Sequence, residues 1–266
     1  MTVDSRSIPF AKATACGNDF IIIEAKHFNG DIAELTRRIC DRNNGVGADG
    51  VEWIYESPNA DIRAHLINSD GSYAEISGNG TRCVAAWYCG EKRSDRAVIE
   101  TGAGFKVCTL TSRQGSEFTF TTQMGTPVVQ APQNMKLSTG EVRGVPVSMG
   151  NPHYVIFVDD FPAHWQEVAA EVQANAEMFP NGTNVEFVRV ADDEKIEIRI
   201  FERGAGETMS SGTGSSASAA AAITIGRTKK VVSVVSPGGP QTVSWEDDEL
   251  KLDGPARIVC IGNYCL

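Results

Sequence analysis

The 266-residue chain is long enough for one large domain or two of ordinary size. Its 41% hydrophobic and 22% charged residues are typical of a packed globular protein, and its formal net charge of −10 argues against nucleic acid or an anionic membrane as a partner. No stretch is apolar enough for a signal peptide or a membrane span, so we expect no membrane partner and a cytoplasmic protein.

Apolar runs bounded by turn residues predict strands throughout the chain. In the first half, the expected strands are 20–24, 51–55, 61–68, 98–101, 107–111 and 117–122, with helices at 31–42 and 80–91. A stretch rich in Pro, Gln and Ser/Thr around 127–140 is expected to be a linker. In the second half, the expected strands are 154–158, 184–190, 195–201, 231–235, 241–245 and 257–261, with helices at 165–176 and 214–225.

The chain repeats itself at half its length. Gly17-Asn18 and Gly150-Asn151, 133 residues apart, each open an apolar run. Ser77-Gly78-Asn79-Gly80 and Ser211-Gly212-Thr213-Gly214, 134 residues apart, each open an alanine-rich segment. We therefore predict an α+β fold of two pseudo-symmetric domains, 1–128 and 129–266, each a mostly antiparallel sheet wrapped on a central helix. The last strand is free to pack on the first domain.

Both Ser-Gly-x-Gly turns precede an expected helix. The first backbone N–H groups of a helix lack internal partners, and the helix dipole adds positive charge there, so such a turn suits a carboxylate. Two related domains would aim two such turns at one small anion. Ser77 and Ser211 would then flank a carbon next to a carboxylate, the layout that racemisation or epimerisation requires. A serine at this position is also an ordinary N-cap, but its occurrence in both halves favours the functional interpretation.

Two other patterns bear on cofactors and metals. Gly45-Val46-Gly47-Ala48-Asp49-Gly50 matches the letters of a dinucleotide fingerprint, but a strand, not a helix, is expected after it. The seven scattered cysteines lack the spacing of a zinc site. We therefore expect reduced, mostly buried thiols, no metal and no cofactor.

These motifs, in this order, resemble those of the diaminopimelate epimerase family along nearly the whole chain. They are Gly17-Asn18-Asp19-Phe20, Gly45-Val46-Gly47-Ala48-Asp49-Gly50, Asn68-Ser69-Asp70-Gly71-Ser72, Gly78-Asn79-Gly80-Thr81-Arg82-Cys83, Gly150-Asn151-Pro152-His153, Glu202-Arg203-Gly204-Ala205-Gly206 and Gly212-Thr213-Gly214. The resemblance implies a pyridoxal-phosphate-free isomerase that interconverts LL- and meso-diaminopimelate in lysine biosynthesis. It also implies a homodimer.

The resemblance also assigns roles to individual residues. It implies substrate contacts from Asn18, Asn68, Asn151, Asn184 and Arg203, of which Asn68, Asn184 and Arg203 lie toward the distal amino-acid end. The turns at Gly78-Asn79-Gly80 and Gly212-Thr213 would supply amides to the carboxylate at the reacting carbon. His153 and Glu202 would support the catalytic pair.

Ser77 and Ser211 fall where the family carries its catalytic cysteines. A helix N-terminus lowers a thiol's pKa, whereas a serine hydroxyl needs a separate base to ionise near pH 7. The serines are an introduced pair, a natural form that keeps epimerase activity by a modified mechanism, or the mark of a diverged member. The alternatives to diaminopimelate epimerisation are a catalytically silent amino-acid-binding homologue, a racemase for another amino acid, and a lyase or other isomerase of the same fold.

Overall fold

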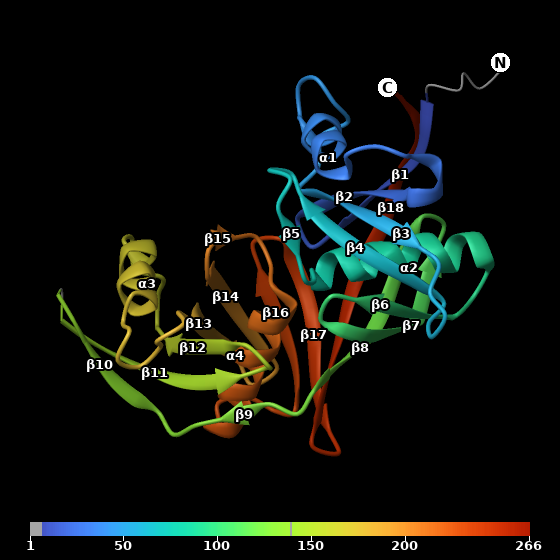
Figure 1. The fold of residues 1–266 in the computed structure, drawn as a ribbon. Coiled ribbons are helices and arrows are strands. Elements are labelled where there is room, and N and C mark those ends of the chain that lie inside the picture. The colour runs from blue at the N-terminus through green and yellow to red at the C-terminus, as the bar shows by residue number, and fades with distance from the viewer. Residues whose placement is uncertain (1–6, 139) are drawn as a thin grey trace. The chain divides into compact units, whose positions relative to one another are not determined.

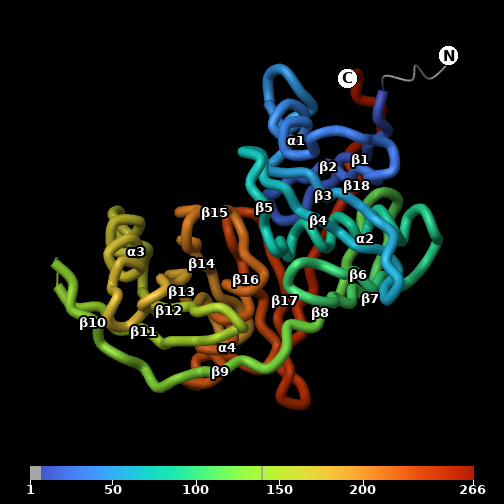
Figure 2. The backbone as a smooth tube through the Cα atoms, in the orientation of Figure 1, coloured from blue at the N-terminus to red at the C-terminus, as the bar shows by residue number. Residues whose placement is uncertain are grey.

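The computed structural model describes residues 7–138 and 140–266. The chain divides into two compact units, one of Met1–Thr122 with Gly254–Leu266 and one of Gln123–Asp253. This division differs from the expected 1–128 and 129–266 because the end of the last strand, β18 (Glu249–Cys265), pairs with β1 (Ser7–Ala15). Figure 2 shows this blue beginning and red end of the chain side by side.

The first unit surrounds one helix, α2 (Gly78–Lys92), with strands (Figure 1). Its other elements are β1, β2 (Asn18–Glu24), η1 (Ala25–His27), α1 (Ile32–Cys40), β3 (Gly50–Tyr55), β4 (Ile62–Asn68), β5 (Tyr73–Ala74), β6 (Arg96–Thr101), β7 (Gly104–Gln114) and β8 (Glu117–Gly125). Cys83, Val84, Ala85, Ala86 and Cys89 of α2 are fully buried against the sheet. A helix that is small and apolar on most sides is stable only when enclosed, which explains its central place.

The second unit repeats this plan around α4 (Gly212–Thr224), whose run of four alanines is fully buried. Its other elements are β9 (Val128–Val129), β10 (Gln133–Leu137), β11 (Gly140–Ser148), β12 (Pro152–Phe157), α3 (Trp165–Gln173), β13 (Asn184–Asp192), β14 (Lys195–Glu202), β15 (Gly206–Thr208), β16 (Val231–Ser236), β17 (Gly239–Glu246) and the start of β18. The equivalence with the first unit extends to strand direction. β2 pairs parallel with β3, which pairs antiparallel with β4, and β12, β13 and β14 do the same.

Each sheet separates two apolar layers. In β3, the side chains of Val51 and Trp53 face the layer that contains α1, whereas Ile54 faces the layer that contains α2. In β13, Phe187 faces α3 and Val188 faces α4 in the same way. The alternation follows from the two-residue period of a strand. Glu52 and Glu186 therefore fall on the faces that meet the central helices.

The predicted fold class is confirmed, and all the predicted strands and helices are present. The expected linker at 127–140 is partly wrong, because it contains β9 and β10. β3 follows Gly45–Gly50 directly, as expected for a segment that is not a dinucleotide-binding turn. Among the described residues, none of the helices combines the length and apolar character needed to cross a membrane.

The layer beneath α2 allows a matched test of the core. Phe120 of β8 is fully buried, whereas Phe105 of β7 is 54% exposed. We expect Phe120→Ala to lower the free energy of unfolding by about 3–5 kcal/mol, since it removes buried apolar area and leaves a cavity. Phe105→Ala should change it by less than about 0.5 kcal/mol. Urea titrations followed by circular dichroism measure both, and equal losses would contradict this layer assignment.

Candidate functional site

The two Ser-Gly-x-Gly turns are built alike. Ser77 is the N-cap of α2, and its Oγ accepts a hydrogen bond from the Gly80 N–H at 3.1 Å. Ser211 is the N-cap of α4, and its Oγ accepts from the Gly214 N–H at 3.2 Å. Both serines have extended backbone angles, as N-cap residues do. Each hydroxyl is thereby fixed at the positive end of a helix dipole.

Each turn also presents backbone donors. Among the described residues, the N–H groups of Gly78 and Asn79 have no hydrogen-bond acceptor, and neither do those of Gly212 and Thr213. The Gly80 N–H, which the sequence assigns to the substrate carboxylate, is instead taken by Ser77 Oγ. The unpaired amides of each turn are thus the two that directly follow the serine, a suitable arrangement for an anion.

A hydrogen-bond chain orients the first turn. The buried Arg82 guanidinium donates to Asn79 Oδ1, and Asn79 Nδ2 donates to Asn18 Oδ1 at 2.7 Å. Asn18 Nδ2 in turn donates to Asp49 Oδ2 at 3.0 Å. Asn18 and Asn79 are therefore joined beside Ser77, as expected if both serve one site. Asn68 is held separately, because its Nδ2 donates to Ser72 Oγ at 3.0 Å.

His153 lies in the second unit on β12 and is buried. Its Nδ1 is 2.8 Å from Glu186 Oε1, and its Nε2 is 3.1 Å from Asn151 Oδ1. His153 makes no hydrogen bond to Ser211 among the described residues, and Glu186 is the group that links the two. Ser211 Oγ instead lies 3.4 Å from Thr213 Oγ1.

The remaining predicted residues of this unit lie at the ends of β13 and β14. Asn184 begins β13, and its Oδ1 accepts from the Arg203 N–H at 2.9 Å. The exposed Arg203 side chain donates to the Asn181 carbonyl oxygen at 2.9 Å. Asn184 and Arg203 are therefore neighbours, as a shared role toward one end of a substrate requires. Glu202 ends β14, and its charge helps to raise the pKa of Glu186.

Two buried glutamates, Glu52 and Glu186, were missed by sequence reasoning. Glu52 is 3% exposed and Glu186 fully buried. A Cβ added at Gly80 would collide with Glu52 Oε1, and one added at Gly214 would lie 2.8 Å from Glu186 Oε1. The same two positions lie 3.2 Å from Ser77 Cβ and 3.1 Å from Ser211 Cβ. Each glycine therefore leaves room for a carboxyl group next to the serine turn.

A signal for these glutamates exists in the sequence. Val51-Glu52-Trp53 and Val185-Glu186-Phe187 repeat at 134 residues, the offset of the serine turns. A single acidic residue inside an apolar strand is unusual unless it has a role. Two of them at the repeat offset are stronger evidence than either alone.

Burial without a partner controls the state of these acids. Burial alone raises the pKa of Glu52 to about 8, and no hydrogen bond to its carboxyl group is present among the described residues. Burial also raises the pKa of Glu186, and His153 offsets part of this effect. Near neutral pH, Glu52 therefore exchanges between its neutral and ionised forms, the range that suits a general acid or base.

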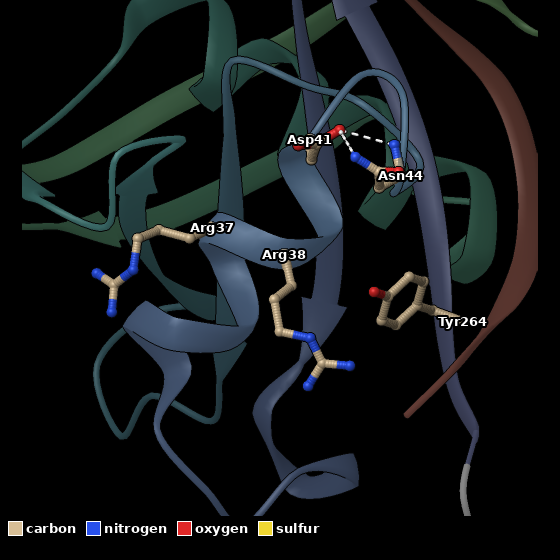
Figure 3. Close-up of a pocket in the computed structure, with 5 residues that line it drawn as sticks. All are labelled: Arg37, Arg38, Asp41, Asn44 and Tyr264. Carbon is tan, nitrogen blue, oxygen red and sulfur yellow. Dashed lines mark hydrogen bonds between the residues drawn. The ribbon is translucent and has the colours of Figure 1, made fainter.

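The largest surface hollow in the described part of the first unit is elsewhere. Arg38 and Tyr264 point toward it, and Asp41 accepts hydrogen bonds from the backbone and side chain of Asn44 at its rim (Figure 3). Its lining comes from α1, the loop after α1 and β18. It contains no residue of either serine turn.

Comparison with known proteins decides the family. The family model described as diaminopimelate epimerase matches residues 10–130 and 145–259. A diaminopimelate epimerase from Pelotomaculum thermopropionicum is 38% identical, over 96% of this chain and 98% of the relative. The chain belongs to the diaminopimelate epimerase family. The isomerase class predicted from the sequence is thereby confirmed.

Solved structures with low sequence identity share the fold of this family. A phenazine biosynthesis protein from Bacillus anthracis superposes with a TM-score of 0.70 at 18% identity, covering 98% of this chain and 99% of its own. A hydroxyproline epimerase from Agrobacterium vitis has the same TM-score at 16% identity, covering 100% of this chain and 94% of its own. At such identities the likeness concerns architecture alone.

The glycine that accommodates Glu186 gives one prediction. Gly214→Ala places a methyl group against Glu186 Oε1 and Ser211 Cβ in a buried turn. We expect it to lower the free energy of unfolding by about 1–3 kcal/mol through overpacking. Gly212→Ala is the matched control, since its Cβ would meet only Met124 Cε at 3.9 Å, and it should change stability by less than about 1 kcal/mol. Similar losses in thermal unfolding would show that the Glu186 contact does not matter.

The state of Glu52 gives another. Its folded pKa of about 8 exceeds the ordinary value of 4.5, so the folded protein holds this proton more tightly than the unfolded chain. The stabilisation is complete below about pH 4.5 and is lost as the pH rises through 8. The only ionisable neighbour that feels Glu52 charge strongly is Cys83, whose own pKa burial holds far above neutral.

Glu52→Gln removes this ionisation. Relative to the unsubstituted protein, the variant should gain stability on the order of 4 kcal/mol between pH 5 and pH 9, at about 1.4 kcal/mol per pKa unit. Urea unfolding across this range measures the difference. Parallel stability profiles would mean that Glu52 does not titrate in this interval.

Proposed function

We propose that the chain epimerises LL-diaminopimelate to meso-diaminopimelate by moving one proton at the substrate's α-carbon. Family membership over nearly the full chain supports this substrate. The observation that carries the proposal is the duplicated turn. Ser77 and Ser211 occupy equivalent N-caps, each followed by two unpaired amides that suit the carboxylate next to the reacting carbon.

Each unit supplies one half of what the reaction needs. Epimerisation removes a proton from one face of a carbon and returns one to the opposite face. Ser77 with the amides of Gly78 and Asn79 forms one half, and Ser211 with those of Gly212 and Thr213 forms the other. The turn amides would stabilise the charge that develops on the substrate carboxylate when the α-proton leaves.

The residues at the strand ends would bind the distal part of the substrate. Arg203 carries a planar cation suited to a second carboxylate, and Asn184 fixes the Arg203 backbone. Asn18, Asn68 and Asn151 would add amide contacts. On the resemblance, Ser77 and Ser211 stand where other members carry cysteine, so this member would work without a thiol. The homodimer implied by the resemblance stays a prediction.

A cytoplasmic site of action fits the thiols. Five of the seven cysteines are buried, all seven are unpaired, and a reducing compartment keeps them so.

Proton exchange tests the function. LL-diaminopimelate is incubated with the protein in D₂O, and the α-proton signal is followed by NMR. We expect deuterium at the α-carbon together with meso product. Ser77→Ala and Ser211→Ala should each reduce inversion by about 10²–10⁴-fold, the usual contribution of a positioned acid or base.

A Ser77→Cys/Ser211→Cys variant serves as the reference for the scaffold. If only this variant is active, the substrate assignment stands but the serine form is not an epimerase. If both forms are silent, diaminopimelate is the wrong substrate.

A further inference from the structure

Each serine turn has a buried carboxyl group beneath it, and the two are related by the internal repeat. Glu52 lies on β3 and Glu186 on β13, and their strands are equivalent in pairing and direction. Glu52 Oε1 borders the Cβ-free side of Gly80, and Glu186 Oε1 borders that of Gly214. Because the serine side chains border the same two positions, each carboxyl group is the nearest buried acid to a turn serine.

These groups have bonding capacity that the fold does not use. Among the described residues, Glu52 has no hydrogen-bond partner, and Glu186 Oε2 is buried without one. Ser77 Oγ accepts from an amide but donates its own hydrogen to no group in the described residues. Buried polar atoms normally find partners, and an unpaired carboxyl group is costly. Two such groups at equivalent places call for a functional explanation.

The chemistry supplies that explanation. A serine hydroxyl does not remove an α-proton unless a base takes its own proton. A carboxyl group that changes state near neutral pH is suited to this exchange. No other buried acid lies against either turn within the described residues.

The two carboxyl groups differ in one respect. Glu186 is held by His153 Nδ1 at 2.8 Å, whereas the equivalent position in the first unit is Phe20, which packs in the apolar core. His153 fixes Glu186 Oε1 and shares a proton with it. Glu52 has no such partner. The two halves are therefore alike in layout but not in proton affinity, as an acid and a base acting together must be.

We propose that Glu52 and Glu186 are the proton carriers of the epimerisation, each acting through the serine of its own turn. This inference rests on the proposed function. In one direction, Ser77 Oγ takes the α-proton while the Ser77 hydroxyl proton passes to the Glu52 carboxylate. The C–H electron pair stays on the substrate. On the opposite face, the Ser211 hydroxyl gives its proton to the α-carbon, and the Glu186 carboxyl group replaces it. The reverse direction exchanges these roles, with no redox change.

Acting through serine, Glu52 and Glu186 are positioning residues, and the test must separate proton transfer from structural support. LL- and meso-diaminopimelate are supplied separately in D₂O to the unsubstituted protein, Glu52→Gln and Glu186→Gln. Inversion should fall by about 10²–10⁴-fold in both variants. Each variant should still exchange the α-proton of one isomer without inverting it, through the intact half, and the two variants should retain opposite isomers.

Glu117→Gln on the exposed part of β8 is the matched control and should behave as the unsubstituted protein. Circular dichroism verifies that each variant is folded. If the glutamate variants match Glu117→Gln, the carboxyl groups carry no proton and only this inference fails. Loss of exchange with both isomers in either variant would indicate a structural role and also overturns it. If the unsubstituted protein exchanges neither isomer, the proposed function fails, and this inference fails with it.

Discussion

The packing of a buried carboxyl group against a glycine in the first turn of a central helix is the constraint on which the rest of this structure depends. Gly80 and Gly214 must lack a Cβ because Glu52 and Glu186 occupy that space. The same glycines donate their N–H groups to the turn serines. One residue type thus sets the position of the acid, the serine and the free amides together. The surrounding apolar sheet keeps water from the acid and so holds it near its neutral form.

Much of the architecture was predictable because it follows from local patterns. Strand alternation and the small residues of α2 and α4 indicated two α+β units, and the repeat at half the chain length indicated that they are related. β1 and β11 were not predicted, for different physical reasons. β1 contains lysine and small alanines and owes its conformation to pairing with β2 and β18 on both sides. β11 contains Gly144 and Pro146, which normally interrupt a strand pattern.

The site was predicted in part. The serine turns are visible as a repeated sequence, and the structure joins Asn18 to Asn79 and Asn184 to Arg203 as a shared site requires. The role of Glu186 as the partner of His153 depends on strand register, which no local pattern specifies. Glu52 was overlooked because an isolated acid in an apolar strand is ordinarily given little weight. Comparing the two halves position by position was the missing step.

The central claim is that proton transfer here uses hydroxyl and carboxyl groups and no thiol. The most direct test is the rate at which the protein inverts LL-diaminopimelate before and after its accessible thiols, including the exposed Cys260 and Cys265, are fully alkylated under native conditions. The account predicts that inversion is present beforehand and survives alkylation, whereas the Ser77→Cys/Ser211→Cys protein becomes sensitive. Loss of inversion on alkylation of the unsubstituted protein, or its absence from the start, would contradict the account.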